Sequence, residues 1–124
     1  MKKFMAMIGS TKPDLNGDVF SEEALKKLAE SPLPIPLTLE FQRNLKIGDV
    51  TGLYVENRRL IAVGLCTDFD DMVPVIGYQY DVHDEGKLKL FEVSLVPPDR
   101  ALMPDTWIKE ADEKLTGAGK IEEE

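Results

Sequence analysis

Short apolar runs separated by turn-forming residues dominate the chain. Residues 3–9 are apolar but too few for a helix, and residues 10–18 are rich in proline, aspartate, asparagine and glycine. Residues 47–56 and 59–66 are rich in β-forming residues, contain no proline and flank a polar pair. This pattern predicts an early strand, a turn and then a β-hairpin.

A second hairpin is predicted where residues 73–82 meet residues 87–96 across a turn at 83–86. Both alternating faces of the return strand carry apolar residues, which is expected in a closed or covered sheet. For a turn at residues 84–87, Ser94 is expected opposite Gly77.

One helix is predicted after the first turn. Ser21 is a favourable N-cap, and Glu22 and Glu23 follow it in the first turn, where the helix dipole favours negative charge. Apolar residues then recur at helical spacing. The helix should end by Ser31, because Pro32 disfavours helical geometry in the residue before it.

Pro32, Pro34 and Pro36 occupy every second position of the next segment. A proline has no backbone N–H to donate to a neighbouring strand. We therefore expect residues 31–38 to be an extended segment at the edge of the sheet and not a central strand.

The 124 residues suit one domain, since two would each be smaller than usual. Its predicted class is α+β, mainly β, with six or seven strands and one clear flanking helix. We place the domain at residues 1–109, with Trp107 anchoring a loop over 99–109. Residues 110–124 contain six acids and two lysines and are expected to form a mobile acidic tail.

Composition excludes several kinds of function. Acids exceed bases by 23 to 15, and a net charge of −8 disfavours nucleic-acid binding because the surface repels phosphates. No apolar run approaches the ~20 residues that span a bilayer, so no membrane association is expected. Cys66 is the single cysteine and His83 the single histidine, so neither an internal disulfide nor a common zinc site is expected. We expect no cofactor.

Residues 14–19 resemble the start of an EF-hand calcium loop, with Asp14, Asn16 and Asp18 at its first three ligand positions. The loop also needs a glycine at position 6 and a bidentate glutamate at position 12, where this chain has Val19 and Leu25. A plain turn before the helix is the favoured interpretation, and no metal site is predicted.

Ser94 and His83 could in principle be a nucleophile and its base. In the predicted hairpin, however, His83 lies six residues along the strand from Gly77, which is roughly 20 Å at ~3.3 Å per residue. A Ser–His hydrogen bond needs about 3 Å. We therefore interpret His83 as a polar residue beside a turn.

Several segments in this order resemble the prohead (capsid maturation) proteases of tailed phages. That family has an early strand, a D-x-x-G-D turn, a helix, an I-G-x-V strand with a hairpin, a serine-containing S-I-G-F strand and a closing E-V-S-L-V-P strand. The matching segments here are STKPDLNGDVFSEEAL, KIGDVTGLYVENRRLIAVGL, VIGYQY and FEVSLVPPDRAL, within residues 5–102. The resemblance implies a small β-barrel with flanking helices, like the herpesvirus assembly proteases.

The catalytic residues of that family do not carry over. Its histidine would fall on Phe41 and its serine on Val75, so the proton relay of a serine protease is absent at these positions. Glu92 stands where the family often has an acid. The segment between the two hairpins is also shorter than in the family, and Pro74 alters the strand that follows it.

The resemblance, without its catalytic residues, predicts a non-catalytic phage structural protein: a head decoration, minor capsid or capsid-assembly protein. We expect it in the virion, and in the host cytoplasm during assembly, bound to capsid or other virion proteins. Several copies on a particle, or a homo-oligomer, are expected. The expected partner surface comprises residues 31–45 and the 99–109 loop, with these candidate residues: Pro34, Pro36, Phe41 and Trp107.

Two alternatives stay open. One is a serine-type capsid maturation protease with displaced catalytic residues, using Ser94 or Ser10 with His83. The other is a bacterial binding domain of prophage origin.

Overall fold

The computed structural model describes residues 1–67, 71–81, 87–103 and 105–111. His83 and residues 112–124, on which some of the expectations above depend, lie outside this part of the chain. The elements follow in this order: β1 (Lys2–Ser10), α1 (Glu22–Ala29), β2 (Ile35–Leu39), β3 (Gln42–Glu56), β4 (Arg59–Cys66), β5 (Val73–Asp81), β6 (Lys87–Val96), a 3-10 turn (Pro98–Arg100) and β7 (Trp107–Glu110).

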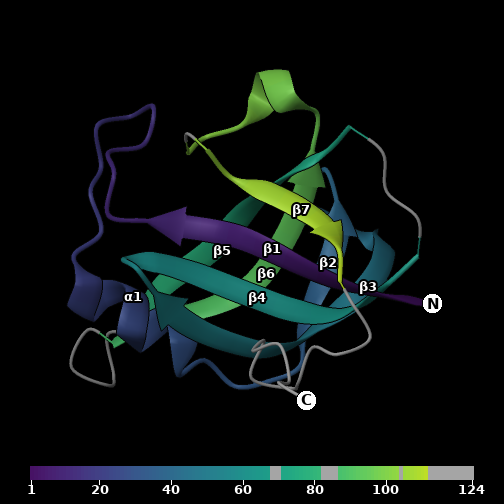
Figure 1. Ribbon diagram of the computed structural model, residues 1–124, viewed down its shortest axis with the longest axis horizontal. Helices are drawn as coiled ribbons and strands as arrows, with labels where there is room; N and C mark the ends of the chain where they lie inside the picture. The colour runs from purple at the N-terminus through teal and green to yellow at the C-terminus, as the bar shows by residue number, and fades with distance from the viewer. Residues whose placement is uncertain (68–70, 82–86, 104, 112–124) are drawn as a thin grey trace, which may run out of the picture.

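All seven strands of the described residues belong to one sheet, in the order β5-β6-β2-β3-β4-β1-β7. The sheet curls until β5 comes close to β1 and β7, so that β1, β4 and β7 cross over β5 and β6 (Figure 1). The helix α1 packs against β6, β3 and β4. The predicted class, mainly β and barrel-like with one clear helix, is confirmed.

The helix forms as its sequence predicts. The Ser21 hydroxyl accepts a hydrogen bond from the Ala24 backbone N–H at 3.0 Å, which satisfies one of the free donors of the first turn. Leu25 and Leu28 are fully buried in the core. After the helix, the Ser31 hydroxyl donates to the Leu28 carbonyl at 2.6 Å and accepts from the Leu90 N–H at 2.8 Å. One side chain thus joins the helix end to β6.

Two tight hairpin turns use backbone in the left-handed region. Asn57 and Arg58, with φ of 51° and 60°, connect β3 to β4 as predicted. Glu40 and Phe41, with φ of 48° and 58°, connect β2 to β3 in the same way, which the sequence did not indicate. Paired left-handed residues match the twist of the flanking strands.

The expectation of an edge strand after the helix is wrong. β2 lies in the middle of the sheet, antiparallel to β3 on one side and parallel to β6 on the other. The parallel pairing begins only at Leu37, one residue after Pro36. The proline therefore stands just outside the pairing with β6, where the absence of its N–H does no harm.

The register expected for a turn at residues 84–87 is also wrong, by two residues at Ser94. Val75 lies opposite Ser94, and Gly77 lies opposite Glu92. The register shifts after Gly77, and Phe91 is the extra residue on β6, as in a β-bulge. Core-facing positions change there from Leu88 and Leu90 to Val93 and Leu95. The bulge explains why apolar residues occupy both alternating sets of positions along this strand.

Trp107 begins a strand and does not lie in a loop. β7 pairs antiparallel with β1, Met7 opposite Trp107 and Phe4 opposite Glu110. The Ala111 N–H donates to the Lys3 carbonyl at 2.9 Å. Regular pairing thus continues slightly past the expected boundary between residues 109 and 110.

Candidate functional site

The two positions that the resemblance assigns to catalytic residues lie beside one buried serine. The Phe41 backbone N–H donates to the Ser94 Oγ at 2.6 Å, and Val75 is the residue opposite Ser94 on β5. Ser94 is completely buried, and its hydroxyl faces the Thr38 carbonyl at 3.4 Å. The hydroxyl is therefore part of the structure of the β2–β3 turn and is closed to solvent.

Glu92 lies two residues before Ser94 on β6 and is 5% exposed. The Thr38 hydroxyl donates to Glu92 Oε2 at 2.5 Å, a short charge-assisted hydrogen bond between β2 and β6. A buried carboxylate needs such a partner, since burial without one is costly. The acid that the resemblance pointed to thus has a structural partner, and neither Phe41 nor Val75 supplies the imidazole and hydroxyl of a protease.

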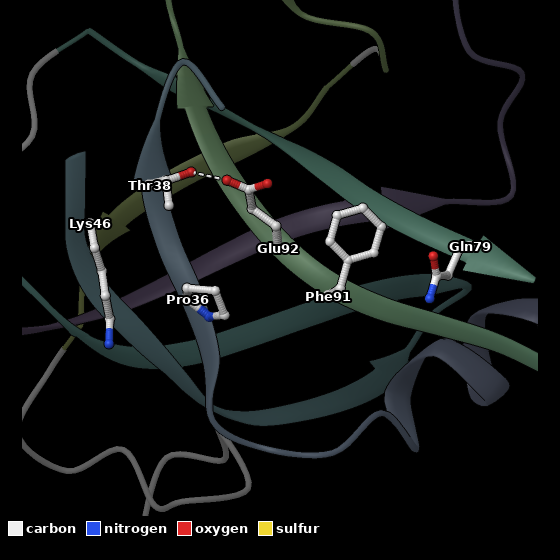
Figure 2. Close-up of a pocket in the computed structure, with 6 residues that line it drawn as sticks. All are labelled: Pro36, Thr38, Lys46, Gln79, Phe91 and Glu92. Carbon is white, nitrogen blue, oxygen red and sulfur yellow. Dashed lines mark hydrogen bonds between the residues drawn. The ribbon is translucent and has the colours of Figure 1, made fainter. Parts of the chain in front are cut away.

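A pocket of about 500 Å³ opens over this carboxylate (Figure 2). Its lining side chains come from four strands: Pro36, Thr38, Lys46, Gln79, Phe91 and Glu92. The Phe91 ring is 40% exposed and lies over Gly77, where a Cβ would come within 3.0 Å of the ring. An acceptor, a cation, an amide and an aromatic ring in one pocket suit the binding of a peptide segment.

The predicted partner residues do not form one patch. Pro36 lines the Glu92 pocket, and Phe41, 44% exposed, sits on the turn that covers Ser94. Pro34 is exposed just before β2. Trp107 lies in β7, at one end of the strand order, and lines a different pocket.

That second pocket, about 540 Å³, includes the candidate residue Trp107, whereas its cationic side chains were not predicted. Its lining includes the β3–β4 turn, the segment after β1 and the start of β7: Met7, Ser10, Thr11, Lys12, Asn57, Arg58, Arg59, Asp105 and Trp107. Lys12 Nζ donates a hydrogen bond to Asp105 Oδ2 at 2.7 Å. This hydrogen bond and the positive charge of Lys12 lower the pKa of the exposed Asp105 carboxyl, and the charge of Arg59 lowers it further. The sequence feature that could have indicated this pocket is the pair Arg58 and Arg59 at a predicted turn.

The calcium-like segment is a turn. Asp14 Oδ1 accepts the backbone N–H groups of Asn16 and Asp18 at 2.8 and 2.9 Å, which uses the carboxylate within the loop. No group of three or more metal-ligating side chains occurs among the described residues. In the same part of the chain, no helix is long and apolar enough to cross a membrane.

Comparisons with known proteins show a likeness of fold alone. No family model and no curated protein matches the sequence. A crystal structure of the Kaposi's sarcoma-associated herpesvirus protease, in complex with an allosteric inhibitor, superposes with a TM-score of 0.58 over 97% of this chain and 84% of that chain, at 12% identity. The chain has a herpesvirus-protease-like fold.

A second structure of the herpesvirus protease, bound to a hexapeptide phosphonate inhibitor, gives a TM-score of 0.54 at 11% identity. The match covers 90% of this chain and 66% of that chain. The herpesvirus-protease-like barrel implied by the resemblance is thereby confirmed, while the relation to phage prohead proteases stays a prediction.

Proposed function

We propose that this chain is a non-catalytic structural protein of a phage particle. It uses a prohead-protease-like barrel to bind capsid or other virion proteins, and it is present in several copies per particle. Repetition on a particle makes weak individual contacts sufficient, because neighbouring contacts act together.

The observation that carries the proposal is the environment of Ser94. The positions that the resemblance assigns to the base and the nucleophile hold Phe41 and Val75, and both adjoin this residue. Ser94 itself is fully buried and accepts the Phe41 N–H. A protease scaffold with these substitutions retains its barrel and its surfaces, which supports a binding role.

Exposed apolar side chains on the β2–β3 hairpin and on β6 support the proposed contact surface. Phe41 and Leu45 of the β2–β3 hairpin are 44% and 40% exposed, and Phe91 of β6 is 40% exposed. Aromatic residues are enriched at protein interfaces, where they bury much area at a small entropy cost. We name Phe41, Leu45 and Phe91 the hairpin face.

The test is co-sedimentation of the purified chain with capsids assembled from the phage's major shell protein. Phe41→Ser and Phe91→Ser should each weaken binding about tenfold, the loss expected when an interface aromatic is truncated. Leu65→Ser is the matched control, because Leu65 on β4 is 41% exposed and lies outside the hairpin face. Deleting residues 31–45 is unsuitable, since it would remove β2 from the middle of the sheet.

A mass-spectrometric inventory of purified virions supplies the second measurement. The proposal requires this chain in the particle at a fixed ratio to the major shell protein. Its absence from virions would refute the structural role and favour a bacterial binding domain of prophage origin.

The second candidate is a serine-type capsid maturation protease with displaced catalytic residues. The likeness of fold to a viral protease favours this candidate. Incubation with the capsid precursor would reveal cleavage, and cleavage that disappears in His83→Ala would establish this alternative. A fluorophosphonate probe adds a direct readout, because it labels only an activated serine. Labelling of Ser94 or Ser10 would contradict the non-catalytic proposal.

A further inference from the structure

Positively charged side chains cluster at the second pocket, although the chain as a whole is acidic. Three cations, Lys12, Arg58 and Arg59, line it together with a single acid, Asp105, whereas the whole chain carries a net charge of −8. Among the described residues, neither arginine forms an ion pair. Both are exposed, so their guanidinium groups are accessible to an outside anion.

Backbone geometry holds these cations in place. Arg58 belongs to the two-residue turn between β3 and β4, with a left-handed φ of 60°. The Thr11 N–H donates to the Arg58 carbonyl at 3.2 Å and ties the segment after β1 to this turn. Arg59 pairs with Ser10 at the start of β4. The cations therefore project from a hairpin end anchored to β1, which reduces the entropy lost when a ligand binds.

An aromatic surface lies beside these charges. Trp107 is partly exposed and lines the pocket, and Lys109 Nζ stands 4.9 Å from the centre of its ring. The pocket thus combines guanidinium groups, which bind carboxylates in a bidentate manner, with an indole face that packs against aliphatic or aromatic groups.

We propose that this pocket, which we name the Arg58–Trp107 pocket, binds an extended acidic peptide segment of a partner protein. The carboxylates pair with Arg58 and Arg59, while apolar side chains of the segment pack on Trp107. A nucleic acid is the less suitable polyanion, because its phosphates would extend beyond the pocket over a surface of net negative charge. This site is separate from the hairpin face and does not depend on whether the chain is catalytic.

The test uses Trp107 as its own reporter, since it is the only tryptophan of the chain. The probe is a synthetic peptide with the sequence of residues 110–124, which has six acids, two lysines and no aromatic residue. Titrating it into the full-length protein should change the Trp107 emission in a saturable way. A control peptide with all six acids replaced by their amides should bind at least about tenfold more weakly, as should the acidic peptide in about 0.5 M salt.

The variant Arg58→Asn/Arg59→Gln should weaken peptide binding about fivefold to tenfold, the loss expected for two exposed charge contacts. Asparagine at position 58 tolerates the left-handed backbone, and thermal unfolding monitors the fold. The matched control is Lys26→Gln/Lys27→Gln, which removes the same charge from the adjacent exposed pair on α1. It should bind as the unmodified chain does.

Three results would overturn the proposal. One is equal weakening in the α1 control, which would indicate a general charge effect. Another is a single-stranded oligonucleotide that binds more tightly than the peptide. The third is a triple variant of the chain's own acids, Glu122→Gln/Glu123→Gln/Glu124→Gln, that binds the peptide more than about tenfold more tightly than the unmodified chain. Such tightening would show that the pocket is occupied by its own chain and not by a partner.

Discussion

The Phe41 backbone N–H donates to the Ser94 Oγ at 2.6 Å, so this buried serine closes the turn between β2 and β3. Ser94→Ala leaves this N–H without a partner in a partly buried place. We expect a loss of about 1–2 kcal/mol in the free energy of unfolding, measured in urea with an unchanged m-value. Particle binding by the folded variant should be unaffected. A variant as stable as the unmodified chain would contradict this structural role.

Thr38→Val tests the hydrogen bond to the buried Glu92 carboxylate. Valine has nearly the shape of threonine but cannot donate, so the carboxylate loses a close partner. The expected destabilisation is about 1–3 kcal/mol by chemical denaturation. Thr51→Val on β3 is the control, because Thr51 is exposed and its loss should change stability by no more than about 0.5 kcal/mol. Equal effects at the two sites would refute the role of the bond.

Gly64 and Gly9 should respond differently to alanine. A Cβ on Gly64 would overlap the Asp49 carbonyl oxygen of the neighbouring strand, and backbone cannot move aside cheaply. A Cβ on Gly9 would meet Leu25, Leu60 and Met103 at ordinary contact distances of 3.7 to 3.9 Å. Thermal unfolding should show a loss of about 2–4 kcal/mol for Gly64→Ala and a change within about 1 kcal/mol for Gly9→Ala.

Lys12→Gln should raise the pKa of Asp105, since the hydrogen bond and charge of Lys12 lower it. NMR titration of the Asp105 carboxyl measures the change directly. A lowered carboxyl pKa stabilises the folded state above the pKa of the unfolded chain, and this contribution disappears as the pH falls through the lower folded-state value. Any dependence of stability on this pair should thus lie on the acid side and be absent in Lys12→Gln. An unchanged titration curve would contradict the ion pair.

Local features of the fold could be predicted from the sequence alone. The Ser21 cap, the Asn57–Arg58 turn and the end of β6 before its two prolines each depend on residues a few positions apart. The framework motifs also pointed to the barrel. Short-range steric contacts and hydrogen bonds determine such features, so the local sequence is enough to predict them.

Tertiary structure alone decided the rest. Whether Pro36 lies at an edge or in the middle depends on where β6 begins to pair with β2, more than fifty residues later in the chain. The bulge at Phe91 shifts the register of the hairpin and turns Glu92 toward Thr38, which the alternation of residues could not show. The Arg58–Trp107 pocket combines three distant segments. Local propensity carries no information about such long-range pairings, because they form only when the whole sheet closes around its core.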